Sequence, residues 1–294
     1  MGQFTQVLVA GLSQGSIYAL LGLGFCIVSM STRILNIAQG AYALIGGFLF
    51  VTLAVKLKVP LAGAFAICIL AAGVMGAVTE WIVNLSTKPW KPVSPITAVL
   101  ATLALLVIVE GAAFLIWGAD PQLGKPVQTG VFRLMDAVIP WQYVWNIAAL
   151  IAITVALHLF LTLTWTGRAM RANAENSLMS HLLGVNVRRL GTIAFVIGAA
   201  IGATAGILAS PITWIDYQMG GTFMLFGLLA FLIGGENSIA GPMVGGLLLG
   251  LVENVFLLVP GVAGGLLKQV VPMLVLLLML VVRPEGLLGR KAGS

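Results

Sequence analysis

The chain has 294 residues, of which 60% are hydrophobic and only 8% are charged, and its formal net charge is +6. Soluble domains carry about 25% charged residues, so this composition excludes an ordinary water-soluble protein and predicts one lipid-embedded domain over residues 1–294. The basic residues are scattered over short loops, which indicates membrane sidedness and argues against nucleic-acid binding.

Apolar runs of membrane-spanning length recur along the whole chain. Crossing a bilayer takes about 20 helical residues, so the sequence predicts an all-α polytopic bundle of about eight or nine membrane segments. The segment 222–235 is too short to cross comfortably and is expected to be a half-helix or a tilted piece. The residues around Asn36 are a candidate break within the membrane. The expected segments are 4–30, 34–55, 59–84, 95–117, 140–163, 191–213, 222–235, 242–259 and 264–282.

Loop charges orient the chain by the positive-inside rule. The segment 165–190 carries four arginines against one acid, and the 84–94 loop and the C-terminal tail are also basic. The 118–139 loop is balanced. We therefore expect the segment 165–190, the 84–94 loop and the C-terminal tail to face the cytoplasm, and the 118–139 loop to face outward, in a multi-pass membrane protein.

Glycines recur at four-residue spacing on single helix faces. Helices associate in lipid by close backbone approach, so these stripes predict packing contacts and not a solute site. The glycines concerned are Gly198, Gly202 and Gly206, then Gly241 with Gly245, and Gly246 with Gly250.

Two motifs resemble catalytic sites but lack their requirements. The run GLSQG at 11–15 fits the G-x-S-x-G nucleophile elbow, yet it lies in an apolar helical run without the strand–turn–helix context. The stretch 118–125 resembles a phosphate-binding loop, but its spacing is one residue too long and Pro126 replaces the required Ser or Thr. We expect no catalysis, metal or cofactor on this chain, so if it takes part in an ATP-driven process, the ATP and Mg²⁺ are bound by a separate ATPase polypeptide.

Ionisable residues within the spans are candidates for function, because burying a charge in lipid costs from about 2.5 kcal/mol upward. A cluster of neutral polar residues is a second group of candidates. Gln14 and Tyr18 share a helix face. Asn36 and Gln39 stand at the start of a helix, whose N-terminal dipole favours a carboxylate. The alternative for each residue is hydrogen bonding, capping or packing. The candidates for lining a solute pathway are Gln14, Tyr18, Asn36, Gln39, Glu110 and Glu253.

The segment 165–190 is too long for a tight turn and has a helical pattern of its own. Gly184 is placed to end that helix. Such an amphipathic helix could lie in the headgroup layer or insert into a groove on a partner protein, and its composition leaves both open. The residues that share its apolar side are Ala172, Leu178, Met179, Leu182 and Leu183.

Several ordered motifs share one known pattern. They are GSIYAL at 15–20, LNIAQG at 35–40, GRAMRA at 167–172, LGVN at 183–186, a glycine-rich region at 234–253 and RPEGLLG at 283–289. Together they closely resemble the branched-chain amino acid ABC transporter permeases of the LivH type, nearly from end to end.

The resemblance implies a heteromeric importer of the bacterial inner membrane. In it a LivM-like second permease completes the pathway, two ATP-binding subunits sit below, and a periplasmic binding protein delivers a branched-chain amino acid or a related amino or organic acid. The resemblance also implies that the segment 165–190 holds a coupling helix that docks on the ATPase. The residues expected to serve this coupling are Gly167, Arg168, Arg171, Glu175, Leu182 and Gly184.

Two sites depart from the family pattern. Where the family usually has His–Gly followed by an acid, this chain has Gln39, Gly40 and Ala41, and Glu236–Asn237 stands where apolar and small residues are usual. The missing acid could have met an α-ammonium group, so aromatic acids and other carboxylate or amide solutes become comparable alternatives. An ion-coupled secondary transporter, which would need no ATPase, is a further alternative.

Overall fold

The structure is a computed structural model that describes residues 2–85, 94–134, 137–235, 238–256, 273–274, 277–278 and 286–288. Most of the expected segment 264–282, the loop with Lys88 and Lys91, and the pair Glu236–Asn237 lie outside these residues. The helices are α1 (Gly2–Thr32), α2 (Gln39–Val51) with the π-helical turn η1 (Thr52–Lys56), α3 (Leu61–Leu85), α4 (Pro95–Trp117), α5 (Trp141–Leu163), α6 (Trp165–Glu175), α7 (Ser177–Leu182), α8 (Val187–Ala209), α9 (Met219–Gly234) and α10 (Ala240–Phe256). The strands β1 (Val131–Leu134) and β2 (Ala137–Pro140) form an antiparallel hairpin.

Six helices of the described chain are long and apolar enough to cross a membrane: α1, α2 extended by η1, α3, α4, α5 and α8. α9 and α10 are shorter, with 16 and 17 residues. The short helix expected at 222–235 is therefore confirmed as α9. Helices satisfy their own backbone hydrogen bonds in lipid, so this all-α architecture suits a multi-pass integral membrane protein.

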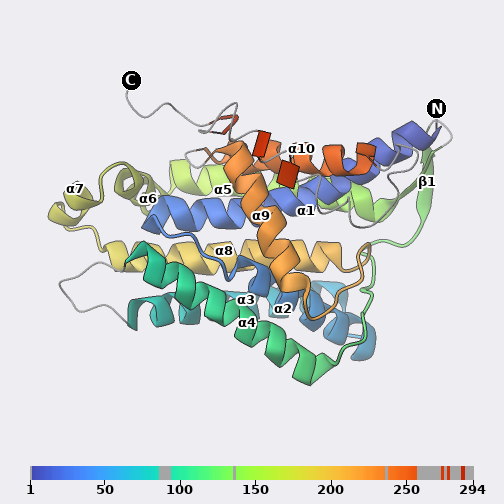
Figure 1. Ribbon diagram of the computed structural model, residues 1–294, viewed down its shortest axis with the longest axis horizontal. Coiled ribbons are helices and arrows are strands. Elements are labelled where there is room, and N and C mark those ends of the chain that lie inside the picture. The colour runs from blue at the N-terminus through green and yellow to red at the C-terminus, as the bar shows by residue number, and fades with distance from the viewer. Residues whose placement is uncertain are drawn as a thin grey trace.

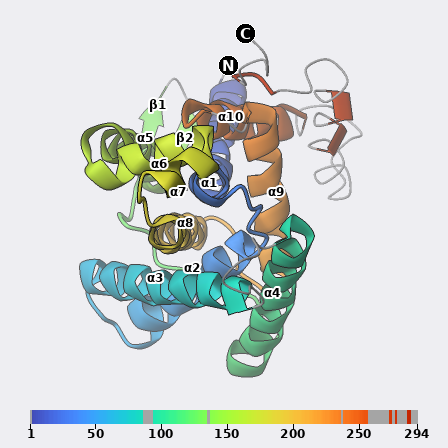
Figure 2. The same cartoon turned by 90° about the vertical axis from the view of Figure 1, so that its left-hand side faces the viewer.

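The bundle has a buried centre and lipid-facing sides. α1 and α8 run side by side through the middle, with α10 along α1 and with α2, α3 and α4 on the far side of α8 (Figures 1 and 2). Most residues of α1 and α8 are buried. In contrast, α3, α4 and α5 leave large apolar side chains exposed, for example Leu70, Leu115 and Ile151. Such faces suit contact with lipid tails.

Four glycines form the contact between α1 and α10. Gly11 and Gly15 on α1 lie against Gly246 and Gly250 on α10, at four-residue spacing on both helices. A Cβ at Gly15 would lie 2.8 Å from the Gly246 carbonyl oxygen, and a Cβ at Gly246 would lie 2.5 Å from the Ala19 Cα. The backbones therefore touch directly, which is how helices associate in lipid.

The glycine stripe of α8 also serves packing, as the spacing predicts. A Cβ at Gly198 would lie 2.9 Å from Val28 Cγ2 of α1, and a Cβ at Gly202 would lie 2.7 Å from Gln39 Nε2 of α2. Gly206 lies against the α2 backbone. The two central helices and α2 are thus held together by small residues.

Two helix starts and one loop differ most from the sequence expectations. α2 begins at Gln39 and not at 34, because residues 33–38 form a non-helical link; this agrees with the candidate break around Asn36. α8 begins at Val187 and not at 191, because Asn186 Oδ1 accepts a hydrogen bond from Arg189 N at 3.1 Å and caps the helix ahead of its arginines. The β1–β2 hairpin in the 118–139 loop was not expected.

Candidate functional site

A chain of hydrogen bonds joins α1 to α10 inside the bundle. Gln14 Nε2 donates to Tyr18 Oη at 3.0 Å, and Tyr18 Oη donates to Glu253 Oε2 at 2.8 Å. The Tyr18 ring stacks on Phe226 of α9 with centroids 4.5 Å apart. Tyr18 and Glu253 are buried, and Gln14 is half-buried. The structure therefore brings together three of the predicted pathway residues, across a long separation in sequence.

Asn36 and Gln39 lie in the packing around the start of α2. Asn36 Oδ1 accepts from Ala38 N at 3.2 Å, and Asn36 Nδ2 donates to Tyr42 Oη at 3.3 Å. Gln39 Nε2 donates to the carbonyl oxygen of Gly198 on α8 at 3.0 Å. Both side chains are 0% exposed. These are capping and packing contacts, which the sequence leaves open as the alternative to a pathway role.

Glu110 of α4 caps the N-terminus of α9. Its Oε1 accepts a hydrogen bond from Gly221 N at 2.7 Å. The first N–H groups of a helix have no intrahelical acceptor, and the helix dipole favours negative charge there. The N-cap residue of α9, Gln218, makes no side-chain cap hydrogen bond, so the acceptor comes from a neighbouring helix.

Substitution of Glu110 tests whether its carboxylate caps α9, because the loss of a cap lowers the stability of the protein without any solute present. Glu110→Leu removes the acceptor and is expected to lower the free energy of unfolding by about 1–3 kcal/mol, because a helix N–H then stays unsatisfied. Glu110→Gln keeps an acceptor oxygen and is expected to lose much less. Thermal unfolding of the purified protein in detergent measures both. An unchanged melting temperature for Glu110→Leu would contradict the capping role.

A third acid lies within a membrane span and is absent from the residues predicted above. Glu80 of α3 is 6% exposed and accepts a hydrogen bond from Asn84 Nδ2 at 2.5 Å. It also lies beside the Thr192 hydroxyl and the Arg188 guanidinium of α8. Glu80 lies inside the expected segment 59–84, so the sequence alone could have identified it as an acid within a span. Glu80 links α3 to the start of α8.

Ser13 belongs to a structural polar network. Its Oγ accepts a hydrogen bond from Asn146 Nδ2 at 3.0 Å, and Asn146 Oδ1 accepts from Gln142 Nε2 at 3.0 Å. Gln142 Oε1 accepts from Val127 N at 3.0 Å. The three side chains are buried and tie α1, α5 and the loop after α4 together. The GLSQG run is therefore part of a helix in the bundle and not a nucleophile elbow.

The segment 165–190 forms α6, α7 and the first turn of α8, where the sequence predicts a single helix. The break falls at Asn176, whose backbone is extended with φ −147° and ψ 98°. Asn176 Oδ1 accepts a hydrogen bond from Met179 N at 3.0 Å, and asparagine is a strong N-cap residue. This capping bond competes with continuation of α6. Gly184, with φ +79°, follows α7 as predicted.

α6 packs against the bundle, whereas α7 leaves apolar side chains exposed. α6 turns Gly167, Met170 and Asn173 inward, and a Cβ at Gly167 would lie 2.5 Å from the Leu161 Cα of α5. α7 and the turn after it expose apolar side chains: Met179 is 57%, Leu182 73% and Leu183 82% exposed. The side chain of Leu178 lies outside the described residues. The exposed members of the predicted coupling set are Arg168, Arg171, Glu175, Leu182 and Gly184.

Arg33 fastens α6 to the end of α1. Its Nη2 donates to the carbonyl oxygens of Ala174 at 3.0 Å and Glu175 at 3.5 Å. Asn173 Nδ2 donates to the carbonyl oxygen of Ser31 at 2.8 Å. The last carbonyls of a helix have no intrahelical partner, and a cation is favourable there. These hydrogen bonds therefore attach α6 directly to the end of α1 and to the link that follows it.

Removal of the Arg33 guanidinium is expected to loosen this attachment. In Arg33→Ala, amide hydrogen exchange in the last turn of α6 should rise by about threefold to tenfold, because about 1 kcal/mol of local stabilisation is lost. Mass spectrometry of peptides spanning residues 168–178 measures this. Arg133→Ala, on β1 at the other end of the bundle, is the control. Equal exchange in both variants would contradict the attachment.

The chain is similar to known proteins over almost its whole length. The profile of the family described as "Branched-chain amino acid transport system / permease component" matches residues 7–282. The chain is 31% identical to the high-affinity branched-chain amino acid transport system permease protein BraD of Pseudomonas aeruginosa, over 98% of this chain and 96% of that protein. It is 30% identical to permease protein LivH of Escherichia coli K12, again over 98% and 96%. PsaBC from Streptococcus pneumoniae in complex with Fab has a similar fold, with a TM-score of 0.50, 15% identity and coverage of 96% and 92%.

Proposed function

This chain belongs to the family of branched-chain amino acid transport permease components, and from that membership we propose that it is the membrane-spanning permease subunit of an ABC importer for a small organic solute. A LivM-like second permease completes the pathway, and two separate subunits bind and hydrolyse ATP with Mg²⁺. A periplasmic binding protein delivers the solute to the permease at the outer face of the bacterial inner membrane.

The coupling part of this proposal rests on the exposed apolar surface of α7 and of the turn after it. Met179 and Leu182 of α7 and Leu183 of the turn after it are exposed, and α7 lies next to α6 at one end of the bundle (Figure 1). An apolar patch rimmed by charge is typical of a surface that a partner covers. A groove on an ATP-binding subunit would bury this patch. Arg168, Arg171 and Glu175 would then contact the rim of the groove.

The attachment of α6 to α1 supports docking over the alternative of a helix lying in the headgroup layer. A docking helix has to pass force to the spans, and the hydrogen bonds of Arg33 and Asn173 supply such a connection. A helix that lies in the lipid interface needs no such link. Gly167 and Gly184 then act indirectly, the first by allowing close approach to α5 and the second by ending α7.

For the solute pathway, the connected group Gln14, Tyr18 and Glu253 is the strongest candidate. It combines an amide, a hydroxyl and a carboxyl group, which could bind an ammonium or a carboxylate group of a solute. Asn36, Gln39 and Glu110 support the pathway through capping and packing instead.

The solute is proposed to be a branched-chain amino acid, the class that the names of the relatives give. The second candidate is an aromatic acid or another carboxylate or amide solute, favoured by the missing acid at Ala41. Ala41 and Gln39 are both 0% exposed, so this difference bears first on helix packing and leaves an amino-acid solute open.

Reconstitution tests the proposal. The chain is co-purified with the permease, ATPase and binding-protein products of neighbouring reading frames and placed in proteoliposomes. Uptake of leucine or valine should require ATP and vanish with a catalytically inactive ATPase subunit. Preferred uptake of an aromatic acid would support the second solute class. Accumulation by this chain alone, driven by an ion gradient, would refute the importer role.

A further inference from the structure

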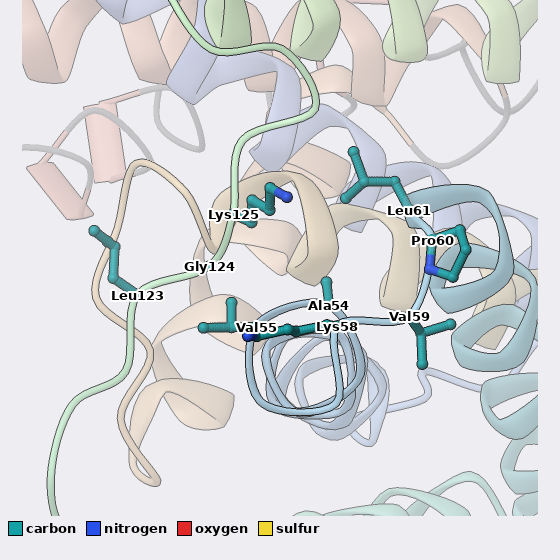
Figure 3. A pocket seen from close by; sticks show the side chains of 9 residues that line it. All are labelled: Ala54, Val55, Lys58, Val59, Pro60, Leu61, Leu123, Gly124 and Lys125. Atoms are coloured by element: carbon teal, nitrogen blue, oxygen red, sulfur yellow. The ribbon is translucent and has the colours of Figure 1, made fainter.

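A cavity of about 540 Å³ opens at the end of the bundle opposite α6 and α7. It lies between the end of α2 and the loop that follows α4 (Figure 3). Val55, Val59, Leu61 and Leu123 give it apolar walls, and Lys58 and Lys125 line it from the two sides. Its volume is within the range of about 300–1,000 Å³ that is common for small-ligand sites.

The local backbone holds Lys58 in an unusual conformation. Lys58 has φ +53°, in the left-handed region, which costs a residue with a side chain about 1–2 kcal/mol. It follows the π-helical turn η1, where Leu57 N donates to Thr52 O at 2.9 Å and Val59 N donates to Leu53 O at 2.9 Å. Strained residues and π-turns persist where their surroundings fix them, and both are enriched at functional sites.

Lys125 is held from the other side of the cavity. The preceding Gly124 N donates to the carbonyl oxygen of Ser210 at 2.8 Å, just beyond α8. Gln122 and Ile215 exchange two backbone hydrogen bonds of 2.9 Å. The loop that carries Lys125 is therefore fixed against the end of the bundle, so both ammonium groups are attached to well-defined backbone.

The position of these cations favours an anion of lipid as the ligand. The cavity lies at the end of the bundle opposite the segment 165–190, so it faces outward if that segment is cytoplasmic, where the positive-inside rule predicts few lysines. α3 begins at Leu61 in the cavity wall, and its exposed apolar residues Ile67, Leu70 and Val74 follow along the lipid-facing side. A phosphate at the lysines would thus have an apolar surface beside it for an acyl chain.

We propose that Lys58 and Lys125 bind the phosphate of an anionic phospholipid at this end of the bundle. The assignment to the outer leaflet rests on the proposed function, whereas the site itself does not. Neither lysine belongs to the solute pathway or the coupling surface, so this site acts as a lipid contact of the permease.

Native mass spectrometry of the full chain in detergent tests the proposal. The protein is incubated with phosphatidylglycerol or with phosphatidylcholine of the same acyl chains, and retained lipid is counted. Lys58→Ala with Lys125→Ala should weaken the binding of phosphatidylglycerol about 30-fold, since each of the two cations near a headgroup contributes about 1 kcal/mol. The control pair Lys56→Ala with Arg133→Ala removes two exposed cations outside the cavity, on η1 and β1, and should stay within about twofold of the unmodified chain.

Several results would overturn the proposal. They are equal losses in the two double variants, equal retention of the two lipids, or full displacement of phosphatidylglycerol by inorganic phosphate, which would indicate a site for a free anion. Protection of both lysines from acetylation by the periplasmic binding protein but not by phosphatidylglycerol would assign the site to an acidic protein surface. If Lys58→Ala does not fold, Lys125→Ala alone carries the same comparison.

Discussion

Gly246→Leu is expected to prevent formation of a stable folded protein. A leucine side chain at this position would enter the α1 backbone, where even a Cβ would lie 2.5 Å from the Ala19 Cα. Overpacking by one group commonly costs about 1–3 kcal/mol, and a clash with backbone on a partner helix cannot be relieved by rotating a side chain. The expected cost is more than about 3 kcal/mol, a large fraction of an ordinary stability of about 5–15 kcal/mol.

The effect extends to the candidate pathway because the same helix pair carries it. Separation of α1 from α10 would also break the hydrogen bond between Tyr18 and Glu253. Fluorescence-detected gel filtration and thermal unfolding in detergent measure the loss. Gly111→Leu on α4 is the matched control, since nothing lies within 4 Å of a Cβ at that glycine. A folded, monodisperse Gly246→Leu protein would contradict the backbone contact.

Leu182→Asp is expected to uncouple the importer without unfolding it. Leu182 is 73% exposed, so the isolated chain should insert and melt as before. In the complex, however, the carboxylate would have to enter an apolar groove on the ATPase. Loss of a central interface anchor costs about 2 kcal/mol or more, equivalent to about 30-fold in affinity. Solute uptake should fall accordingly while the ATPase subunits still hydrolyse ATP.

Two further variants sharpen this test. Arg171→Glu reverses a charge expected at the rim of the groove, so it should weaken coupling less and in a salt-dependent way. Leu182→Met keeps an apolar side chain and should support uptake close to that of the unmodified chain. Normal uptake by both Leu182→Asp and Arg171→Glu would show that α7 does not dock on the ATPase.

Some local features could be predicted well from the sequence. The composition determines that the chain lies in lipid, and the length of the apolar runs determines where the helices lie, including the short α9. The Gly198 stripe and the helix end at Gly184 follow from residue spacing and from backbone freedom. Asn176 shows the limit of this reasoning, because its capping bond broke a helix that the apolar pattern made continuous.

Which polar groups meet depends on how the helices pack together. Tyr18 and Glu253 are 235 residues apart and hydrogen-bond directly, Glu110 caps α9, and Arg33 holds α6. Polar groups inside lipid must find partners on other helices, since water is absent. Helix pairing and rotation select those partners, and neither is encoded within one apolar segment. The chain itself therefore determines its membrane segments and its small-residue faces, whereas the assembled bundle determines the site.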